Sequence, residues 1–147
     1  MTIKSKLVTI MSGGVFMGFL KGKTAIITGG GRAVLQDGSC GSIGYGIATA
    51  YAKEGANLVL TGRNVKKLTD AKEELESKYG IKVLPVHADI SAGADNEAIV
   101  KEVVKKTIDE FGHIDVLINN AQASASGVTI AAVSYTHLRA HETLANL

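Results

Sequence analysis

Several residue types are scarce in this chain: its 147 residues include one cysteine, one proline and no tryptophan. The single cysteine, Cys40, cannot form a disulfide bond within the chain, which favours a reducing, cytoplasmic setting. A reactive thiol is one interpretation of Cys40, and a bystander in a loop is the simpler one. The net charge is only +2 and no basic stretch is present, so nucleic-acid binding is not indicated. Long apolar runs are also missing, because glycines interrupt residues 7–20, and no membrane helix is predicted there.

Length and composition fit one globular domain. With 46% hydrophobic and 20% charged residues, the chain is long enough to bury a core. Residues 18–23 lead directly into the first apolar run, so we expect the domain to begin at Met17. Residues 1–16 are then interpreted as a non-native upstream extension, and residues 17–132 as one truncated domain whose motifs predict its ligand class.

The hydrophobic pattern alternates between short apolar runs and amphipathic segments. The runs predict strands over residues 23–28, 57–61, 82–88 and 115–118, and the amphipathic segments predict helices over residues 43–54, 65–79 and 96–111. Ser42 and Asn64 are typical N-caps, and Gly80 and Gly112 are typical helix stops. The inward stripes are expected at Ile43, Ile47, Ala50 and Tyr51 in the first helix, and at Ile99, Val100, Val103, Val104 and Ile108 in the third. This alternation predicts an α/β fold, a Rossmann-type doubly wound parallel sheet that is truncated after its fourth strand.

A glycine-rich turn joins the first predicted strand to the first predicted helix. Gly29 to Gly31 form one group, and Gly44 follows a polar insert at residues 33–41. Strand, glycine turn and helix is the layout that binds the diphosphate of a dinucleotide, because amide groups at the helix start face the phosphates. Polar residues or glycines also follow the other strands, at residues 62–63, 89 and 119–120. Since the carboxyl ends of parallel strands lie at one edge, the sequence predicts one ligand site there.

Taken together, these motifs resemble the short-chain dehydrogenase/reductase family over about residues 20–127. Thr28, Gly29 and Gly44 are similar to the family's T-G-x-x-x-G-x-G turn, once the insert is allowed. The resemblance implies that Asp89 contacts the adenine ring of a cofactor. It also implies that Asn119, Asn120 and Ala121, which match the family's N-N-A-G motif, steady the sheet beside that cofactor. Such enzymes move hydride between a nicotinamide dinucleotide and a small carbonyl or alcohol, and many are homo-oligomers.

Two departures from the family pattern bear on which branch of the family the chain resembles. Ser42 stands where the middle glycine usually lies, and residues 42–48 (S-I-G-Y-G-I-A) resemble the longer turn of enoyl reductases. Ser42 and Ile43 are accordingly among the predicted cofactor-binding residues. Asn119, Asn120 and Ala121 instead resemble the mainstream carbonyl reductases, of the 3-oxoacyl-carrier-protein and sugar-acid types. That branch is favoured, although Gln122 replaces its motif glycine.

Cofactor choice is predicted from the end of the second strand. An acidic residue there would bind the ribose 2′-hydroxyl, but no Asp or Glu lies between residues 57 and 67. Gly62 occupies that position and Arg63 follows it. A planar guanidinium suits a phosphate, and Arg32 in the glycine turn is a second candidate. NADP(H) is therefore favoured over NAD(H), and a solvated loop charge is the alternative interpretation of Arg63.

The catalytic residues that the family resemblance calls for are missing. No tyrosine after Asn120 is followed four residues later by lysine, and the nearest pair, Tyr135 and Arg139, comes too soon after the fourth strand. His137 and His141 lack a third ligand, so no metal site is predicted. We therefore predict no catalytic residue in this chain and interpret it as an inactive, cofactor-binding fragment of a short-chain oxidoreductase. The alternatives are a non-catalytic nucleotide-binding module and a non-functional gene-prediction fragment.

The last residues do not continue the family pattern. The stretch S-Y-T-H-L-R-A-H-E-T-L at residues 134–144 resembles a peptide that recurs at the ends of unrelated metagenomic predictions, as translated adaptor or library sequence would. We expect residues 133–147 to have that origin.

Overall fold

The computed structural model describes residues 18–89 and 95–122. In chain order the elements are β1 (Thr24–Thr28), α1 (Ile43–Lys53), β2 (Asn57–Gly62), α2 (Val65–Tyr79), β3 (Val83–His87), α3 (Asn96–Phe111) and β4 (Val116–Ile118). Each element begins and ends within one residue of its predicted bounds, so the predicted α/β order is confirmed. The expectations for residues 1–16 and 133–147 concern parts of the chain outside the described residues.

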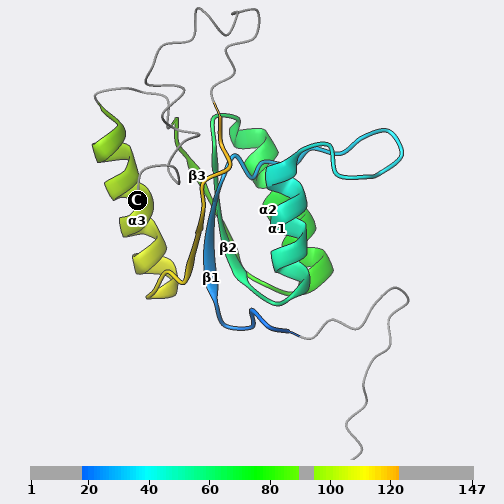
Figure 1. The fold of residues 1–147 in the computed structure, drawn as a ribbon, viewed down its shortest axis with the longest axis horizontal. Coiled ribbons are helices and arrows are strands. Elements are labelled where there is room, and N and C mark those ends of the chain that lie inside the picture. Colours follow the sequence, from blue (N-terminus) through cyan, green and yellow to red (C-terminus); the bar gives the residue numbers. More distant parts are fainter. Residues whose placement is uncertain (1–17, 90–94, 123–147) are drawn as a thin grey trace, which may run out of the picture.

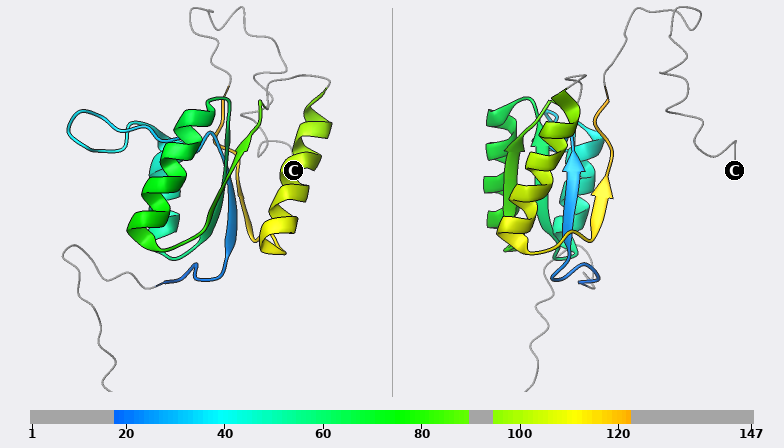
Figure 2. Two further views of the ribbon diagram at one scale, coloured as in Figure 1. Left: turned by 180° about the vertical axis from the view of Figure 1, so that it is seen from behind. Right: turned by 90° about the vertical axis from the view of Figure 1, so that its left-hand side faces the viewer.

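The strands form a single parallel sheet in the order β3-β2-β1-β4. The chain steps outward from β1 to β3 and then crosses back, so that β4 lies on the other side of β1. Helices α1 and α2 cover one face of the sheet and α3 covers the other (Figure 1), and the same three layers are visible from behind and from the side (Figure 2). The reversal of direction between β1 and β4 is a topological switch point, where α/β sheets bind ligands.

Two hydrophobic cores lie on the two faces of the sheet, because successive strand residues point to opposite sides. In β1, Ala25 and Ile27 pack toward α1 and α2, whereas Ile26 packs toward α3. In β2, Leu58 and Leu60 face the first core and Val59 the second. The central strands are therefore apolar on both faces, as the sequence predicts.

Helix α1 is rotated relative to the expected stripe, so that prediction was wrong in part. The buried residues are Gly44, Tyr45, Ala48 and Ala52, and Ile43 is 76% exposed. Ile47 and Tyr51 are only partly buried against the core, and Ala50 is exposed. Three of the four buried residues are small because α1 lies very close to β1 at Gly44, and a larger side chain there would hold the helix away.

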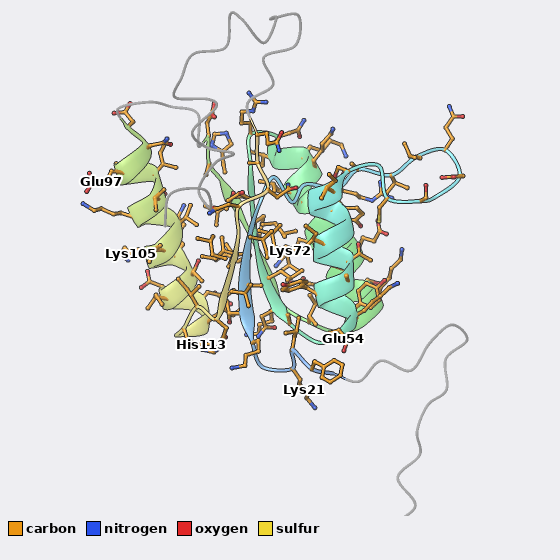
Figure 3. All side chains as sticks on the ribbon, in the orientation of Figure 1. Lys21, Glu54, Lys72, Glu97, Lys105 and His113 are labelled. Atoms are coloured by element: carbon orange, nitrogen blue, oxygen red, sulfur yellow. The ribbon has the colours of Figure 1, made fainter. Side chains whose placement is uncertain are left out.

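The expected stripe of α3 was also only partly correct. Val103 is buried and Ile99 packs against the second core, but Val100, Val104 and Ile108 are between 40% and 51% exposed. Leu117 of β4 is exposed as well. The periodicity predicted an apolar face wider than the part that packs on the sheet, because no described element covers the side of α3 next to β4. Charged side chains such as Glu97 and Lys105 project from α3 into solvent (Figure 3).

The short strand β4 is held at its start by Asp115. Its carboxylate accepts hydrogen bonds from the Thr24 backbone N–H at 2.8 Å and from Lys23 Nζ at 2.9 Å. These two donors, the backbone amide first, hold the pKa of Asp115 below its usual range. His113 lies at the same end of the sheet, with Nε2 3.1 Å from Asp115 (Figure 3). Among the described helices, none is both long and apolar enough to cross a membrane.

Candidate functional site

A cleft of about 380 Å³ lies at the carboxyl ends of the four strands. Its walls include segments that follow every strand: Gly29 after β1, Arg63 after β2, Asp89 after β3 and Asn120 after β4. Six of the predicted cofactor-binding residues line it, namely Gly29, Ser42, Arg63, Asp89, Asn120 and Ala121. The topology therefore brings together residues that are more than ninety positions apart in the sequence, such as Gly29 and Ala121.

Thr28 joins the ends of the two strands at the switch point. Its buried hydroxyl accepts hydrogen bonds from the backbone N–H groups of Asn120 and Ala121, each at 2.9 Å, and donates to the Ile118 carbonyl at 3.3 Å. The Asn120 side chain in turn donates from Nδ2 to the Thr28 carbonyl at 2.9 Å. The hydroxyl's one proton and two lone pairs are all used, so Thr28 positions the loop after β4 and does not point a free group into the cleft.

Gly44 lets the start of α1 approach the end of β1. A Cβ atom built on Gly44 would lie 2.3 Å from the Gly29 carbonyl oxygen and 2.5 Å from Asn120 Nδ2. Gly29 itself has a φ of +72°, a conformation that glycine adopts without strain. Both glycines that match the family turn are therefore required by the backbone: one by its dihedral angle and the other by helix–strand contact.

Two helix N-termini border the cleft. Ser42 caps α1, with its Oγ accepting from the Tyr45 N–H at 3.4 Å, and Asn64 caps α2, with its Oδ1 accepting from the Lys67 N–H at 3.0 Å. Each cap satisfies one amide, and the first amides of a helix have no partner within it. The partial positive charge at these ends favours an anionic ligand in the cleft.

The structure places the other predicted residues beside the cleft or away from it. Thr28 and Gly44 support its walls through the contacts above, and Asn119 is an exposed neighbour of Asn120 outside the lining. The Ile43 side chain is turned to solvent. Arg32 lies on the outer side of the glycine turn, in a second shallow hollow that it shares with Glu74 and Lys78.

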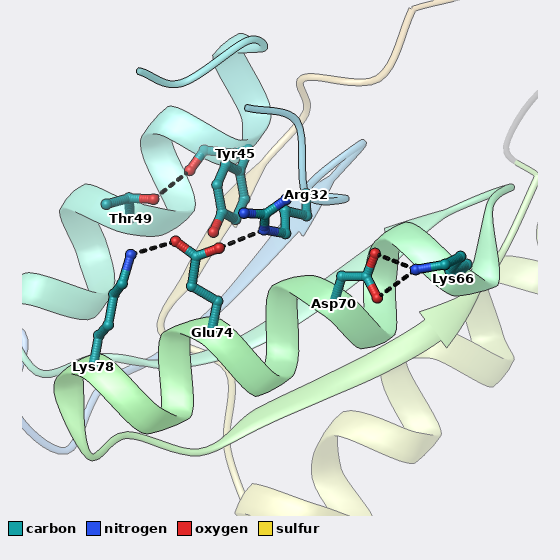
Figure 4. A network of polar contacts seen from close by, with 7 residues as sticks. All are labelled: Arg32, Tyr45, Thr49, Lys66, Asp70, Glu74 and Lys78. Carbon is teal, nitrogen blue, oxygen red and sulfur yellow. Dashed lines mark hydrogen bonds and ion pairs between the residues drawn. The ribbon is translucent and has the colours of Figure 1, made fainter. Parts of the chain in front are cut away.

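Arg32 is engaged by a carboxylate of α2. Its Nε donates to Glu74 Oε2, and Lys78 Nζ contacts the other carboxylate oxygen at 2.5 Å (Figure 4). The hydrogen bonds from Lys78 and Arg32 lower the pKa of Glu74 to about 2. Tyr45 of α1 points toward the same carboxylate, and burial raises the pKa of its hydroxyl (Figure 4). This cluster ties the glycine turn to α1 and α2.

Sequence reasoning missed three lining residues at the junction of the glycine turn and α2: Gly31, Asn64 and Lys67. A Cβ on Gly31 would lie 3.1 Å from the Lys67 Cβ, and the Arg32 N–H donates to the Lys67 carbonyl at 2.8 Å. One signal was available, because Arg63 and Lys67 both lie within three residues of the Asn64 N-cap, at the helix end that favours an anionic ligand. Among the described residues, no group of His, Cys, Asp and Glu is arranged to hold a metal ion.

A family model described as short chain dehydrogenase matches residues 23–139. The chain belongs to this family. The match begins one residue before β1 and ends within residues 133–147, the stretch that the sequence predicts to be non-native.

Among relatives of this short-chain dehydrogenase, a 12alpha-hydroxysteroid dehydrogenase from a Clostridium species is 63% identical over 121 residues, which cover 82% of this chain and 44% of the relative. The 3-oxoacyl-(acyl-carrier-protein) reductase FabG of Chlamydia muridarum is 37% identical over 102 residues, 69% of this chain and 36% of that protein. This chain thus spans less than half the length of these curated relatives.

Solved structures agree with the family. L-sorbose reductase from Gluconobacter frateurii, complexed with NADPH and L-sorbose, aligns with a TM-score of 0.63 at 34% identity, over 80% of this chain and 40% of the reductase. A metagenomic short-chain oxidoreductase in complex with NADP aligns with a TM-score of 0.62 at 26% identity, over 80% of this chain and 47% of the other.

Proposed function

We propose that this chain is the cofactor-binding, N-terminal part of an NADP(H)-preferring short-chain oxidoreductase and that it is not catalytic by itself. The observation that carries the proposal is the cleft onto which all four strand ends converge, with Gly29, Arg63, Asp89 and Asn120 in its walls. Glycine at the turn lets a diphosphate approach the backbone and the start of α1, while Asp89 is suited to the adenine.

Preference for the phosphorylated cofactor is supported by charge at the end of β2. Arg63 lines the cleft, and β2 ends at Gly62 where an acidic residue would favour the unphosphorylated ribose. Two structural relatives were solved with NADPH or NADP. When bound, the nicotinamide of such a cofactor supplies or accepts hydride, and this chain's residues bind and orient the dinucleotide.

The parent protein's activity is proposed from its relatives. Hydride transfer between the cofactor and a carbonyl or secondary alcohol is supported by the hydroxysteroid dehydrogenase and the 3-oxoacyl reductase among them. The 63% identity favours a hydroxysteroid-like substrate over the acyl and sugar-acid types expected from the motifs. We further propose a cytoplasmic, homo-oligomeric parent; the exposed free thiol of Cys40 fits a reducing compartment.

An Arg63→Asp variant tests the cofactor preference. Removing the guanidinium takes away a charged hydrogen bond to the 2′-phosphate and adds an acceptor for a 2′-hydroxyl, so NADPH affinity should fall about 10- to 100-fold while NADH affinity holds or rises. Titration of the 147-residue chain with both nucleotides measures this. The matched control is Lys66→Asp, which removes a cation that is paired with Asp70 and lies outside the cleft lining. Equal losses for NADPH and NADH with Arg63→Asp would overturn the preference.

The genomic locus distinguishes a reductase from a non-catalytic nucleotide-binding module. If the reading frame beyond Ala132 encodes a serine and a Tyr-x-x-x-Lys motif in place of residues 133–147, the parent is an enzyme. A genuine end of the frame without them would favour the non-catalytic module, because this chain supplies binding but no proton donor for the substrate oxygen.

A further inference from the structure

The cleft wall formed by the start of α2 carries a second cation, Lys67, that family-based reasoning does not point to. Three other lysines of α2 are neutralised by a carboxylate one helical turn away: Lys66 by Asp70 at 2.8 Å, Lys72 by Glu76 at 2.9 Å and Lys78 by Glu74 at 2.5 Å. Lys67 has Ala71 at the corresponding position, and four residues before it is Arg63, which precedes the Asn64 N-cap. Within residues 18–89 and 95–122, neither Arg63 nor Lys67 lies within 4.0 Å of a carboxylate.

The backbone of Lys67 is held at the point where the glycine turn crosses α2. Its N–H is capped by Asn64 at 3.0 Å and its carbonyl accepts from the Arg32 N–H at 2.8 Å. A Cβ atom added to Gly31 would lie only 3.1 Å from the Lys67 Cβ, so a glycine at position 31 leaves room for the start of the Lys67 side chain. Both Arg63 and Lys67 line the cleft, so an anion bound there would be attracted by two positive charges.

Arg32 does not supply the second positive charge that lines the cleft beside Arg63. Its guanidinium is bound to Glu74 on the outer side of the turn, next to Lys78, and it lies outside the cleft lining (Figure 4). Releasing it to bind a ligand would leave a partly buried carboxylate with one cation fewer. Lys67, in contrast, needs no existing contact to be broken.

Resting on the proposed function, we infer that Lys67 is a specificity-determining residue, which binds the 2′-phosphate of the cofactor together with Arg63, and that Arg32 is a positioning residue. A phosphate monoester carries nearly two negative charges at neutral pH, which two cations balance. Arg63 provides a planar fork and Lys67 a compact point charge, and both line the cleft at the start of α2. The diphosphate of the cofactor is the other anion that Lys67 could reach, since Gly31 lies beside it.

The test compares Lys67→Gln with the matched control Lys66→Gln in the complete 147-residue chain. Both remove a lysine from the first turn of α2, and only Lys67 lines the cleft. Titrations with NADPH and NADH at low and moderate salt give the affinities. We expect Lys67→Gln to weaken NADPH binding about tenfold and NADH binding less than twofold, with Lys67→Arg retaining the preference. If Lys67→Gln weakened NADPH and NADH binding equally, Lys67 would be assigned to the diphosphate and the inference would be overturned. If Lys67→Gln weakened neither, the inference would also be overturned.

A parallel variant tests the role of Arg32. Because Arg32 acts through Glu74, Arg32→Gln should weaken NADPH and NADH binding by the same factor and lower the unfolding midpoint. If Arg32→Gln weakened the binding of NADPH alone, Arg32 would be a ligand of the 2′-phosphate, and its positioning role would be overturned. The proposed function fails separately: it fails if the unmodified chain binds neither nucleotide, or if Arg63→Asp does not change the preference.

Discussion

Replacing Gly44 with alanine is the sharpest test of how this site is built. The added Cβ would lie 2.3 Å from the Gly29 carbonyl oxygen, about 1 Å short of the 3.4 Å at which ordinary contact begins. Two of the three nearest atoms belong to the Gly29 backbone, which cannot rotate away as a flexible side chain would; the third, Asn120 Nδ2, is held by its hydrogen bond to the Thr28 carbonyl. The start of α1 must therefore move away from β1 by about that distance, and the interior packs too densely to allow this without loss.

The expected change in the free energy of unfolding follows from two opposing effects. Overpacking of this kind costs about 3 kcal/mol. Alanine in place of glycine within a helix recovers up to about 1 kcal/mol. We therefore expect Gly44→Ala to lower the free energy of unfolding by about 2 kcal/mol, a large share of a small domain's stability.

Gly46 provides a matched control in the same helix. A Cβ there would meet only the Cys40 Cβ, at 3.8 Å, an ordinary contact. Gly46→Ala should therefore leave stability unchanged or raise it by up to about 1 kcal/mol. The pair separates the cost of close packing from the general effect of removing a glycine.

Urea unfolding followed by far-ultraviolet circular dichroism measures the difference. For a domain of this size, a loss of about 2 kcal/mol lowers the midpoint by about 1 M. The displacement of α1 should also weaken NADPH and NADH binding equally, because the diphosphate is common to both. If Gly44→Ala unfolded at the same urea concentration as Gly46→Ala, the contact between α1 and Gly29 would not be as close as described.

Two further predictions concern the supports of the cleft. Thr28→Val removes a hydroxyl that bonds Ile118, Asn120 and Ala121, and it takes away the partner of the partly buried Ala121 N–H; we expect a loss of about 1–2 kcal/mol in chemical unfolding, with Thr28→Ser close to the original. If Thr28→Val had the same free energy of unfolding as the original protein, this hydroxyl would not be what holds the strand ends together. The pKa of Glu74 is about 2 in the folded chain and 4.5 ordinarily, so its contribution is complete above pH 4.5 and is lost as the pH falls toward 2. The unmodified chain should be about 1 kcal/mol more stable than Glu74→Gln at pH 7, a small difference because the cations that pair with Glu74 lie at the surface. This difference should shrink as the pH falls below 4.5, and a difference that grows on acidification would contradict the prediction.

Local patterns were sufficient to predict the elements and their ends. Ser42 and Asn64 cap their helices as predicted, and Gly80 and Gly112 end theirs with positive φ angles. These features depend on residues within one helical turn of each other, so they can be predicted without knowing the rest of the fold. The alternation of strands and helices likewise restricted the topology to a parallel sheet with one ligand edge.

The sequence by itself thus determined the order of elements, the family and the edge of the sheet at which the cleft lies, because each rests on short-range periodicity and on motifs at strand ends. Only the tertiary structure decided which side of α1 packs on β1, because that depends on the distance between the helix and Gly29. It also decided that Lys67 lines the cleft while Arg32 is held by Glu74. Arg32 belongs to the glycine turn and Lys67 to α2, and which of them lines the cleft depends on where α2 crosses that turn.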